Sequence, residues 1–121
     1  MTRRSWAYAP DSGGVKTPDR TKAEVRERLT AYAAQNYAGR YERLDIRFRA
    51  QFCYVGAVLN AGGAPMQLCR LRHFRVDRWT VGFFKYSTKT YELCFVDAAG
   101  GFECTAEQGF AVAADVYLSD G

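Results

Sequence analysis

The chain has 121 residues, of which 48% are hydrophobic and 25% are charged, and its formal net charge is +4. This length and composition are typical of one soluble globular domain with a single core. Its apolar runs are far shorter than the roughly 20 residues that cross a bilayer, which argues against a transmembrane helix and against membrane partners. The first residues lack the apolar stretch of a signal peptide, so we expect a cytoplasmic protein.

Residues 1–17 are rich in Gly, Ser, Pro and Arg, and their large aromatic side chains are Trp6 and Tyr8. A segment of this composition buries little apolar surface. We therefore predict a flexible arm over residues 1–17, with Trp6 as its candidate anchor, and a single α+β domain over residues 18–121.

A first helix is predicted to begin at Thr17-Pro18-Asp19. Thr can cap a helix, Pro fits its first turn, and Asp19 faces the positive end of the helix dipole. Apolar residues then recur at steps of three and four, which indicates one buried face: Val25, Leu29, Tyr32, Ala33 and Asn36 or Tyr37. Gly39 suits the end of this helix.

From Glu42 the period changes to two, which predicts a half-buried strand. Leu44, Ile46 and Phe48 alternate there with Asp45, Arg47 and Arg49. Residues 50–59 are nearly all apolar, and two interpretations remain open. They either continue this strand past a bulge or form a second strand covered on both faces. Residues 60–65 are a turn.

Three further stretches have strand character. Residues 67–74 alternate again, and residues 79–86 and 91–97 are rich in aromatic and β-branched side chains. We expect a hairpin loop over residues 75–78, a link over 87–90, and a turn over 98–101 that leads into a short strand at 102–104.

Thr105 and Gln108 have the spacing of a capping box, which predicts a short C-terminal helix that runs to about Ala114. Gly109 weakens this helix by about 1 kcal/mol relative to Ala. Residues 116–118 either add an edge strand or pack against the domain. The predicted fold is therefore α+β, with an N-terminal helix, four to six mostly antiparallel strands and the short C-terminal helix.

Charge is distributed unevenly along the chain. Residues 40–90 contain ten Lys or Arg against three Asp or Glu, whereas residues 91–121 contain six Asp or Glu and no Lys or Arg. On adjacent strands Arg47 and Arg49 would share one face with Arg70 and Arg72 if the registers allow it. Such a face can bind phosphates, with Phe74 or Trp79 available to stack on bases.

A second interpretation of these arginines is internal pairing. They would then cover the solvent side of the sheet and pair with the acidic C-terminal segment, which contains Glu92, Asp97, Glu103 and Glu107. Charge complementarity within the chain favours this interpretation. The sequence has neither an RRM signature nor a GXXG loop that would favour nucleic-acid binding instead.

The four cysteines are Cys53, Cys69, Cys94 and Cys104, and no two of them form a C-x-x-C pair. Each lies in an apolar stretch, so we expect buried, reduced thiols and no metal site. Cys69 and His73 would lie about 13 Å apart on an extended strand, too far to share one ion. A three-residue turn would place Cys94 opposite Cys104, whereas two or four residues would not, and both arrangements remain open.

His73 is the one histidine of the chain. A nucleophile and base could be formed by His73 with Cys53, Cys69 or Cys94, and Asp77 could orient the imidazole. No linear motif of a hydrolase, metalloprotease or phosphate-binding loop accompanies these residues. The catalytic residues of an enzyme, and any cofactor, are therefore not indicated.

The strings LDIRFRAQFCYV, LCRLRHF and DRWTVGFFKYSTKTYELCF resemble a family of short bacterial proteins to which no function is assigned. The resemblance covers roughly residues 40–110. It implies a bacterial, cytosolic protein and brings no activity, ligand or catalytic residue.

The function that we predict is a small non-enzymatic interaction domain. Its partner would be an acidic protein or the nucleic-acid backbone, bound through Arg47, Arg49, Arg70 and Arg72 together with Phe74 and Trp79. The alternative is a small-molecule enzyme or ligand-binding protein with a pocket between the first helix and the sheet, using His73 or a cysteine. Association with further copies of the same chain is left open.

Overall fold

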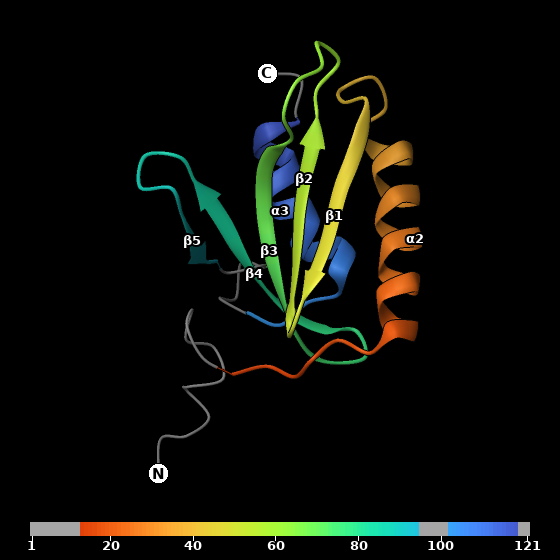
Figure 1. Cartoon of the computed structure of the whole chain (residues 1–121), viewed down its shortest axis with the longest axis vertical. Helices are drawn as coiled ribbons and strands as arrows, with labels where there is room; N and C mark the ends of the chain where they lie inside the picture. Colours follow the sequence, from red (N-terminus) through yellow and green to blue (C-terminus); the bar gives the residue numbers. More distant parts are fainter. Residues whose placement is uncertain (1–12, 95–101, 119–121) are drawn as a thin grey trace.

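The structure is a computed structural model and describes residues 13–94 and 102–118 (Figure 1). Its elements in chain order are α2 (Asp19–Asn36), β1 (Arg43–Arg49), β2 (Phe52–Val58), β3 (Met66–Arg75), β4 (Arg78–Lys85), β5 (Thr90–Leu93) and α3 (Ala106–Tyr117). The five strands form one antiparallel sheet in which neighbours in sequence are neighbours in space. The predicted α+β fold, with a helix at each end of the chain, is confirmed.

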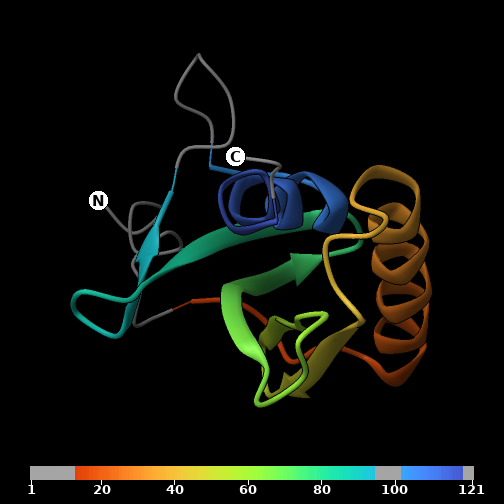
Figure 2. The ribbon, with the colours of Figure 1, turned by 90° about the horizontal axis from the view of Figure 1, so that it is seen from above.

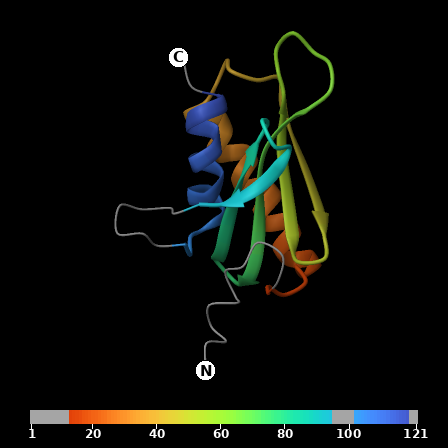
Figure 3. The ribbon, with the colours of Figure 1, turned by 90° about the vertical axis from the view of Figure 1, so that its left-hand side faces the viewer.

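Both helices lie on the same side of the sheet (Figures 2 and 3). Helix α3 packs across β3 and β4, and α2 lies beside α3 and next to β1. The core fills the space between these layers, where Leu29, Leu71, Val81 and Phe110 are fully buried. In the described part of the chain, neither helix has an apolar stretch that could cross a bilayer.

Helix α2 begins without the predicted threonine cap. Pro18 occupies the N-cap position, and no side chain bonds there to the first turn. Thr17 is instead buried, and its backbone N–H donates to the Ala50 carbonyl at 3.0 Å. The buried face of the helix is formed by Val25, Leu29 and Ala33, as the spacing predicts. The helix ends before Gly39, whose φ of 83° is a conformation that glycine adopts without strain.

Residues 50–59 form a tight turn and a second strand rather than a continuation of the first. Ala50 has a φ of 53° in that turn, and β2 then pairs with β1 along its whole length. Cys53, Val55 and Ala57 of β2 are fully buried in the core, whereas Phe52 and Tyr54 are half-buried. From Phe52 to Val55 the burial of β2 therefore alternates as in β1, whereas Gly56, Ala57 and Val58 are all buried, so the second half of the strand is covered on both faces, as one of the two interpretations predicted.

The remaining hairpins lie near the predicted positions. Residues 76–77 connect β3 to β4, with Asp77 at a φ of 54°. Residues 102–104 form no strand, but Cys104 makes an isolated bridge in which it exchanges two backbone hydrogen bonds of 2.8 and 2.9 Å with Trp79. The predicted strand residues 95–97 and the turn predicted over 98–101 lie outside the described residues. That turn would decide whether Cys94 lies opposite Cys104, so both arrangements stay open.

Helix α3 begins with the predicted capping box. Thr105 Oγ1 accepts from the Gln108 N–H at 3.2 Å, and Gln108 Oε1 accepts from the Thr105 N–H at 2.9 Å. The helix continues to Tyr117, past the predicted end, and Leu118 at its C-cap is buried rather than part of an edge strand. A Cβ atom at Gly109 would lie 2.6 Å from Leu71 Cδ2. The glycine thus allows α3 to approach the sheet closely.

The described end of the predicted arm is bonded to the sheet. Val15 donates its N–H to the His73 carbonyl at 2.8 Å, and the Gln51 side chain donates to the Gly13 carbonyl at 3.3 Å. A Cβ atom at Gly14 would lie 2.8 Å from Arg72 Cγ. Residues 13–17 therefore pack on the ends of β1 and β3, and Trp6 and Tyr8 lie outside the described residues.

Candidate functional site

The strand register brings the four predicted arginines to one face of the sheet. Arg47 of β1 lies opposite Tyr54 of β2, which in turn lies opposite Arg70 of β3. In the same way Arg49 and Arg72 lie on either side of Phe52. Their neighbours along each strand face the helices, so these side chains lie on the face that points away from α2 and α3. We call this the open face; it includes Asp45, Arg47, Arg49, Phe52, Tyr54, Gln67, Arg70, Arg72, Phe84 and Tyr91.

Arginine and aromatic side chains alternate across the open face. The guanidinium of Arg70 lies 4.3 Å from the centre of the Phe52 ring and 5.0 Å from that of Tyr91. Arg47 lies 5.8 Å from the centre of the Tyr54 ring. These are cation–π distances, and they hold each ring beside a positive charge.

The four arginines are not equally accessible. Arg47 and Arg49 are exposed and Arg70 is half-buried, but Arg72 is only 4% exposed. Arg72 packs on Phe52, with its guanidinium 5.0 Å from the ring centre, and lies beneath Gly14. A ligand at this face would therefore contact Arg47 and Arg49 first, whereas the buried Arg72 contacts the Phe52 ring.

One of the two aromatic residues expected to stack on a ligand, Trp79, does not join this group. Trp79 is 1% exposed and belongs to the core, where its ring lies 4.9 Å from that of His73. The register explains this, because Trp79 pairs with His73 on the side of the helices. Phe74 is half-buried at the irregularity between His73 and Arg75, beyond which β3 pairs with β4 again.

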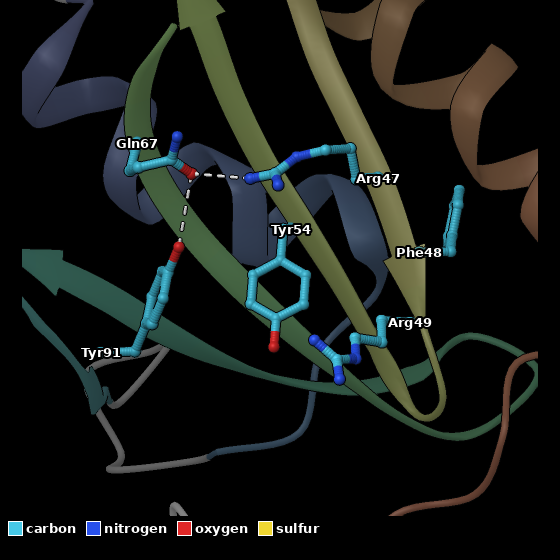
Figure 4. A pocket seen from close by; sticks show the side chains of 6 residues that line it. All are labelled: Arg47, Phe48, Arg49, Tyr54, Gln67 and Tyr91. Atoms are coloured by element: carbon cyan, nitrogen blue, oxygen red, sulfur yellow. Dashed lines mark hydrogen bonds between the residues drawn. The ribbon is translucent and has the colours of Figure 1, made fainter.

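A hollow of about 660 Å³ lies on the open face (Figure 4). Gln67 joins two other residues that line the hollow. Its Oε1 accepts from Arg47 Nη2 at 3.3 Å and from the Tyr91 hydroxyl at 3.4 Å. The volume is that of a small-molecule site. Strands β1, β2, β3 and β5 all contribute to its lining, which consists of Arg47, Phe48, Arg49, Tyr54, Gln67 and Tyr91.

The sequence analysis missed Phe52, Tyr54, Gln67 and Tyr91 as members of the site. The signal for the first two lay in residues 52–55, where aromatic residues alternate with small apolar ones, but the stretch was interpreted only as continuously apolar. Gln67 and Tyr91 are distant in sequence and carry no motif. Only the order of the strands brings them together.

The acidic C-terminal segment has other ion-pair partners in the described part of the chain. Glu107 accepts from Arg28 at 2.6 Å, and Glu103 accepts from Arg78 at 3.2 Å. Glu92 lies 3.8 Å from Lys85, whereas Asp97 lies outside the described residues. On the open face itself, Arg47 lies 3.2 Å from Asp45. Within the described residues, the acidic segment thus pairs with Arg28 of α2 and with Arg78 and Lys85 at the two ends of β4.

The thiols are poorly suited to catalysis. Burial raises the pKa of Cys53 and of Cys104 to about 12, and it raises the pKa of Cys69 well above its usual value. Cys94 is half-buried, and burial raises the pKa of its thiol as well. Since the thiolate is the nucleophile, these shifts disfavour attack at neutral pH. All four are free thiols.

The surroundings of His73 show which of its ring nitrogens donates a hydrogen bond. Its Nδ1 lies 3.1 Å from the Val15 carbonyl oxygen, which can only accept, so Nδ1 is the donor. Its Nε2 is buried without a hydrogen-bond partner in the described region. Within residues 13–94 and 102–118, no group of three or more His, Cys, Asp or Glu side chains is arranged to hold a metal ion.

Comparison of the chain with protein-family models, with curated proteins and with solved structures finds no match. The function must therefore be argued from the open face itself.

Proposed function

We propose that this protein is a small interaction domain that binds single-stranded nucleic acid across the open face of its sheet. The observation that carries the proposal is the hollow, where exposed Arg47 and Arg49 lie beside the rings of Tyr54 and Tyr91. Proteins that bind single strands combine these two elements, a positive groove for the backbone and aromatic rings for the bases.

The arginines support the electrostatic part of the proposal. Arg47 and Arg49 are two residues apart on β1, so their guanidinium groups project from the same face of one strand. Guanidinium groups bind phosphate oxygens with two parallel hydrogen bonds. Arg70 and Arg72 then act on the rings, because their guanidinium groups lie against Phe52 and Tyr91.

The aromatic rings favour a single strand over a duplex. Tyr54 and Tyr91 line the hollow 5.8 Å apart and at a steep angle to each other. A ring can stack only on a base that is unpaired and unstacked, and each such contact contributes about 1–3 kcal/mol. A duplex keeps the faces of its bases stacked on one another, so it would bind through charge without the stacking contribution.

An acidic protein is the other partner that the same charges would attract. It would use Arg47 and Arg49 but would not need unstacked rings. The alternative of an enzyme that uses His73 or a cysteine has less support, because those groups lie on the opposite face with raised thiol pKa values. The resemblance noted from the sequence supports a bacterial, cytoplasmic setting for the proposed function.

The test is binding of a fluorescently labelled, mixed-sequence single strand, measured by anisotropy over a range of salt concentrations. We expect affinity to fall steeply with salt, because each neutralised phosphate releases counterions. Arg47→Gln with Arg49→Gln should lower the slope of log K against log salt by about 0.7 per arginine. The matched control is Arg20→Gln with Lys22→Gln, which removes the same charge from α2 on the other side of the sheet.

Two results would overturn the proposal. One is no measurable binding of the wild-type protein to single strands at low salt. The other is an equal loss of binding in the control variant, which would show that net charge alone attracts the strand. An acidic peptide that displaces the strand and binds more tightly would identify a protein partner instead.

A further inference from the structure

Gln67 is held from three directions at the hollow. Its side-chain oxygen accepts from Arg47 Nη2 at 3.3 Å and from the Tyr91 hydroxyl at 3.4 Å. Its backbone carbonyl accepts from the Tyr86 hydroxyl at 2.9 Å. These donors come from β1, from β5 and from the loop after β4, so three separate parts of the fold converge on one glutamine.

The chemistry of Arg47 decides how the amide is turned. A guanidinium group has donors and no acceptor, so the amide atom that faces it must be the oxygen. An amide oxygen has two lone pairs, and Arg47 and Tyr91 occupy both. The nitrogen, with its two hydrogens, lies on the other side of the amide (Figure 4). The side chain of Gln67 therefore meets a ligand as a donor only.

We infer that Gln67 is a specificity-determining residue that selects bases presenting a carbonyl oxygen over bases presenting an amino group. The inference rests on the proposed function. A glutamine with both amide groups available can bind adenine through two hydrogen bonds, one donated and one accepted. In Gln67 the amide oxygen already accepts from Arg47 and Tyr91, so only the amide nitrogen can bind a base. An exocyclic amino group placed against that nitrogen would face another donor and form no hydrogen bond.

Uracil and cytosine separate this effect from stacking. The two pyrimidines have nearly the same size and stacking surface, and they differ along the edge with positions 3 and 4. Uracil has an N–H donor and a carbonyl oxygen there, whereas cytosine has a ring-nitrogen acceptor and an amino group. Oligo(dU) and oligo(dC) of equal length also carry the same number of phosphates. A difference between them therefore reports hydrogen bonding at the base edge.

The wild-type protein should bind oligo(dU) about tenfold more tightly than oligo(dC), the size of discrimination that one base-edge contact supplies. Gln67→Glu keeps an acceptor for Arg47 and Tyr91 but replaces the amide nitrogen with a second acceptor oxygen. This variant should reverse the preference toward oligo(dC). Gln108→Glu adds the same charge in the capping box of α3, where Glu is equally suited, and should leave the preference unchanged.

Tyr91→Phe gives a second measurement that does not depend on a new charge. It keeps the ring in the hollow and removes the hydroxyl that occupies one lone pair of Gln67. That lone pair can then accept from an amino group, so the ratio of the two affinities should shrink while binding of oligo(dU) stays within about twofold.

Each outcome decides between the two proposals. No binding of either oligonucleotide by the wild-type protein removes the proposed function. Binding without a difference between oligo(dU) and oligo(dC), or an unchanged difference in both Gln67→Glu and Tyr91→Phe, overturns the role of Gln67 and leaves the proposed function standing.

Discussion

The two faces of the sheet are made from the same five strands and differ in what covers them. On the helix side, Leu71, Val81 and Trp79 are buried in the core, where most of their neighbours are apolar. On the open face, rings are covered by the guanidinium groups of arginines instead, as where Arg70 lies over Phe52. The first face excludes water with hydrocarbon, and the second shields its rings with charged groups that still reach water.

This difference separates stability from binding. Burial of apolar area contributes most of the favourable free energy of folding, so the helix face should determine the stability of the domain. Apart from the buried Arg72, the arginines and rings of the open face are only partly buried, and each of their pairs contributes little to stability. The open face buries little apolar area, so its side chains can be suited to a ligand with little loss of stability.

The largest effect is expected for Phe110→Ala. Phe110 is fully buried in α3, and its ring packs edge-on against Tyr32 and Tyr37 at 6.2 and 5.9 Å. Loss of the ring should lower the free energy of unfolding by about 3–5 kcal/mol in urea titrations. Tyr54→Ala on the open face should cost no more than about 2 kcal/mol. Equal losses would break the distinction between the two faces.

Alkaline pH should destabilise the helix face next most strongly. Burial raises the pKa of Cys53 and Cys104 from 9.0 to about 12 in the folded protein. Because the folded pKa lies above the unfolded one, this stability is fully present below about pH 9 and is lost as pH rises toward 12. At about pH 10 the two thiols together should reduce the free energy of unfolding by about 3 kcal/mol relative to neutral pH.

Cys53→Ala is the control for this titration. It removes one of the buried thiols, while Cys69 and Cys104 remain and still titrate. The decrease between neutral pH and about pH 10 should therefore become smaller by about 1.5 kcal/mol in urea titrations at each pH. A decrease of unchanged size in this variant would show that the Cys53 thiol does not contribute to it.

Gly109→Ala should destabilise the protein although alanine favours a helix by about 1 kcal/mol. The new methyl group would lie 2.6 Å from Leu71 Cδ2 and 3.2 Å from Cys104 Sγ, and such overpacking costs about 1–3 kcal/mol. Combining it with Leu71→Ala frees the space that the methyl group needs. The free energy of unfolding that the double variant loses should then be smaller than the sum of the two single losses. Simple additivity would refute the close approach of α3 to the sheet.

The smallest effect is expected on the open face. Phe52→Leu keeps the apolar bulk and removes the π system beneath the Arg70 and Arg72 guanidinium groups. A double-mutant cycle of Phe52→Leu with Arg70→Gln should give a coupling of about 0.5–1 kcal/mol in thermal unfolding. A coupling above 2 kcal/mol would mean that this face, too, determines the stability of the fold.

Local patterns were sufficient for the elements that depend on neighbours in sequence. The steps of three and four from Val25 predicted the buried face of α2, and Thr105 with Gln108 predicted the start of α3, because both rest on geometry within a few residues. The alternation around Ile46 predicted β1 for the same reason. The helix–strands–helix order, and hence the α+β fold, follows from these local signals.

Other features depended on contacts that the sequence does not specify. Thr17 appeared suited to cap α2, but its backbone bonds to Ala50 across the domain, so Pro18 occupies the cap. Gly109 was expected only to weaken a helix, whereas the approach of α3 to Leu71 makes it necessary. Trp79 was expected on the surface, and its pairing with His73 places it in the core.

The sequence by itself determined that arginines alternate with apolar residues on strands, and so that one face of a sheet would carry them. Only the tertiary structure decided which residues share that face, because a shift of one residue in any strand pairing turns every side chain to the other side. The order of five strands is what brings Gln67 within hydrogen-bond distance of Arg47 and Tyr91. Their hydrogen-bonding groups meet at one amide oxygen although 44 positions separate Arg47 from Tyr91 in the chain.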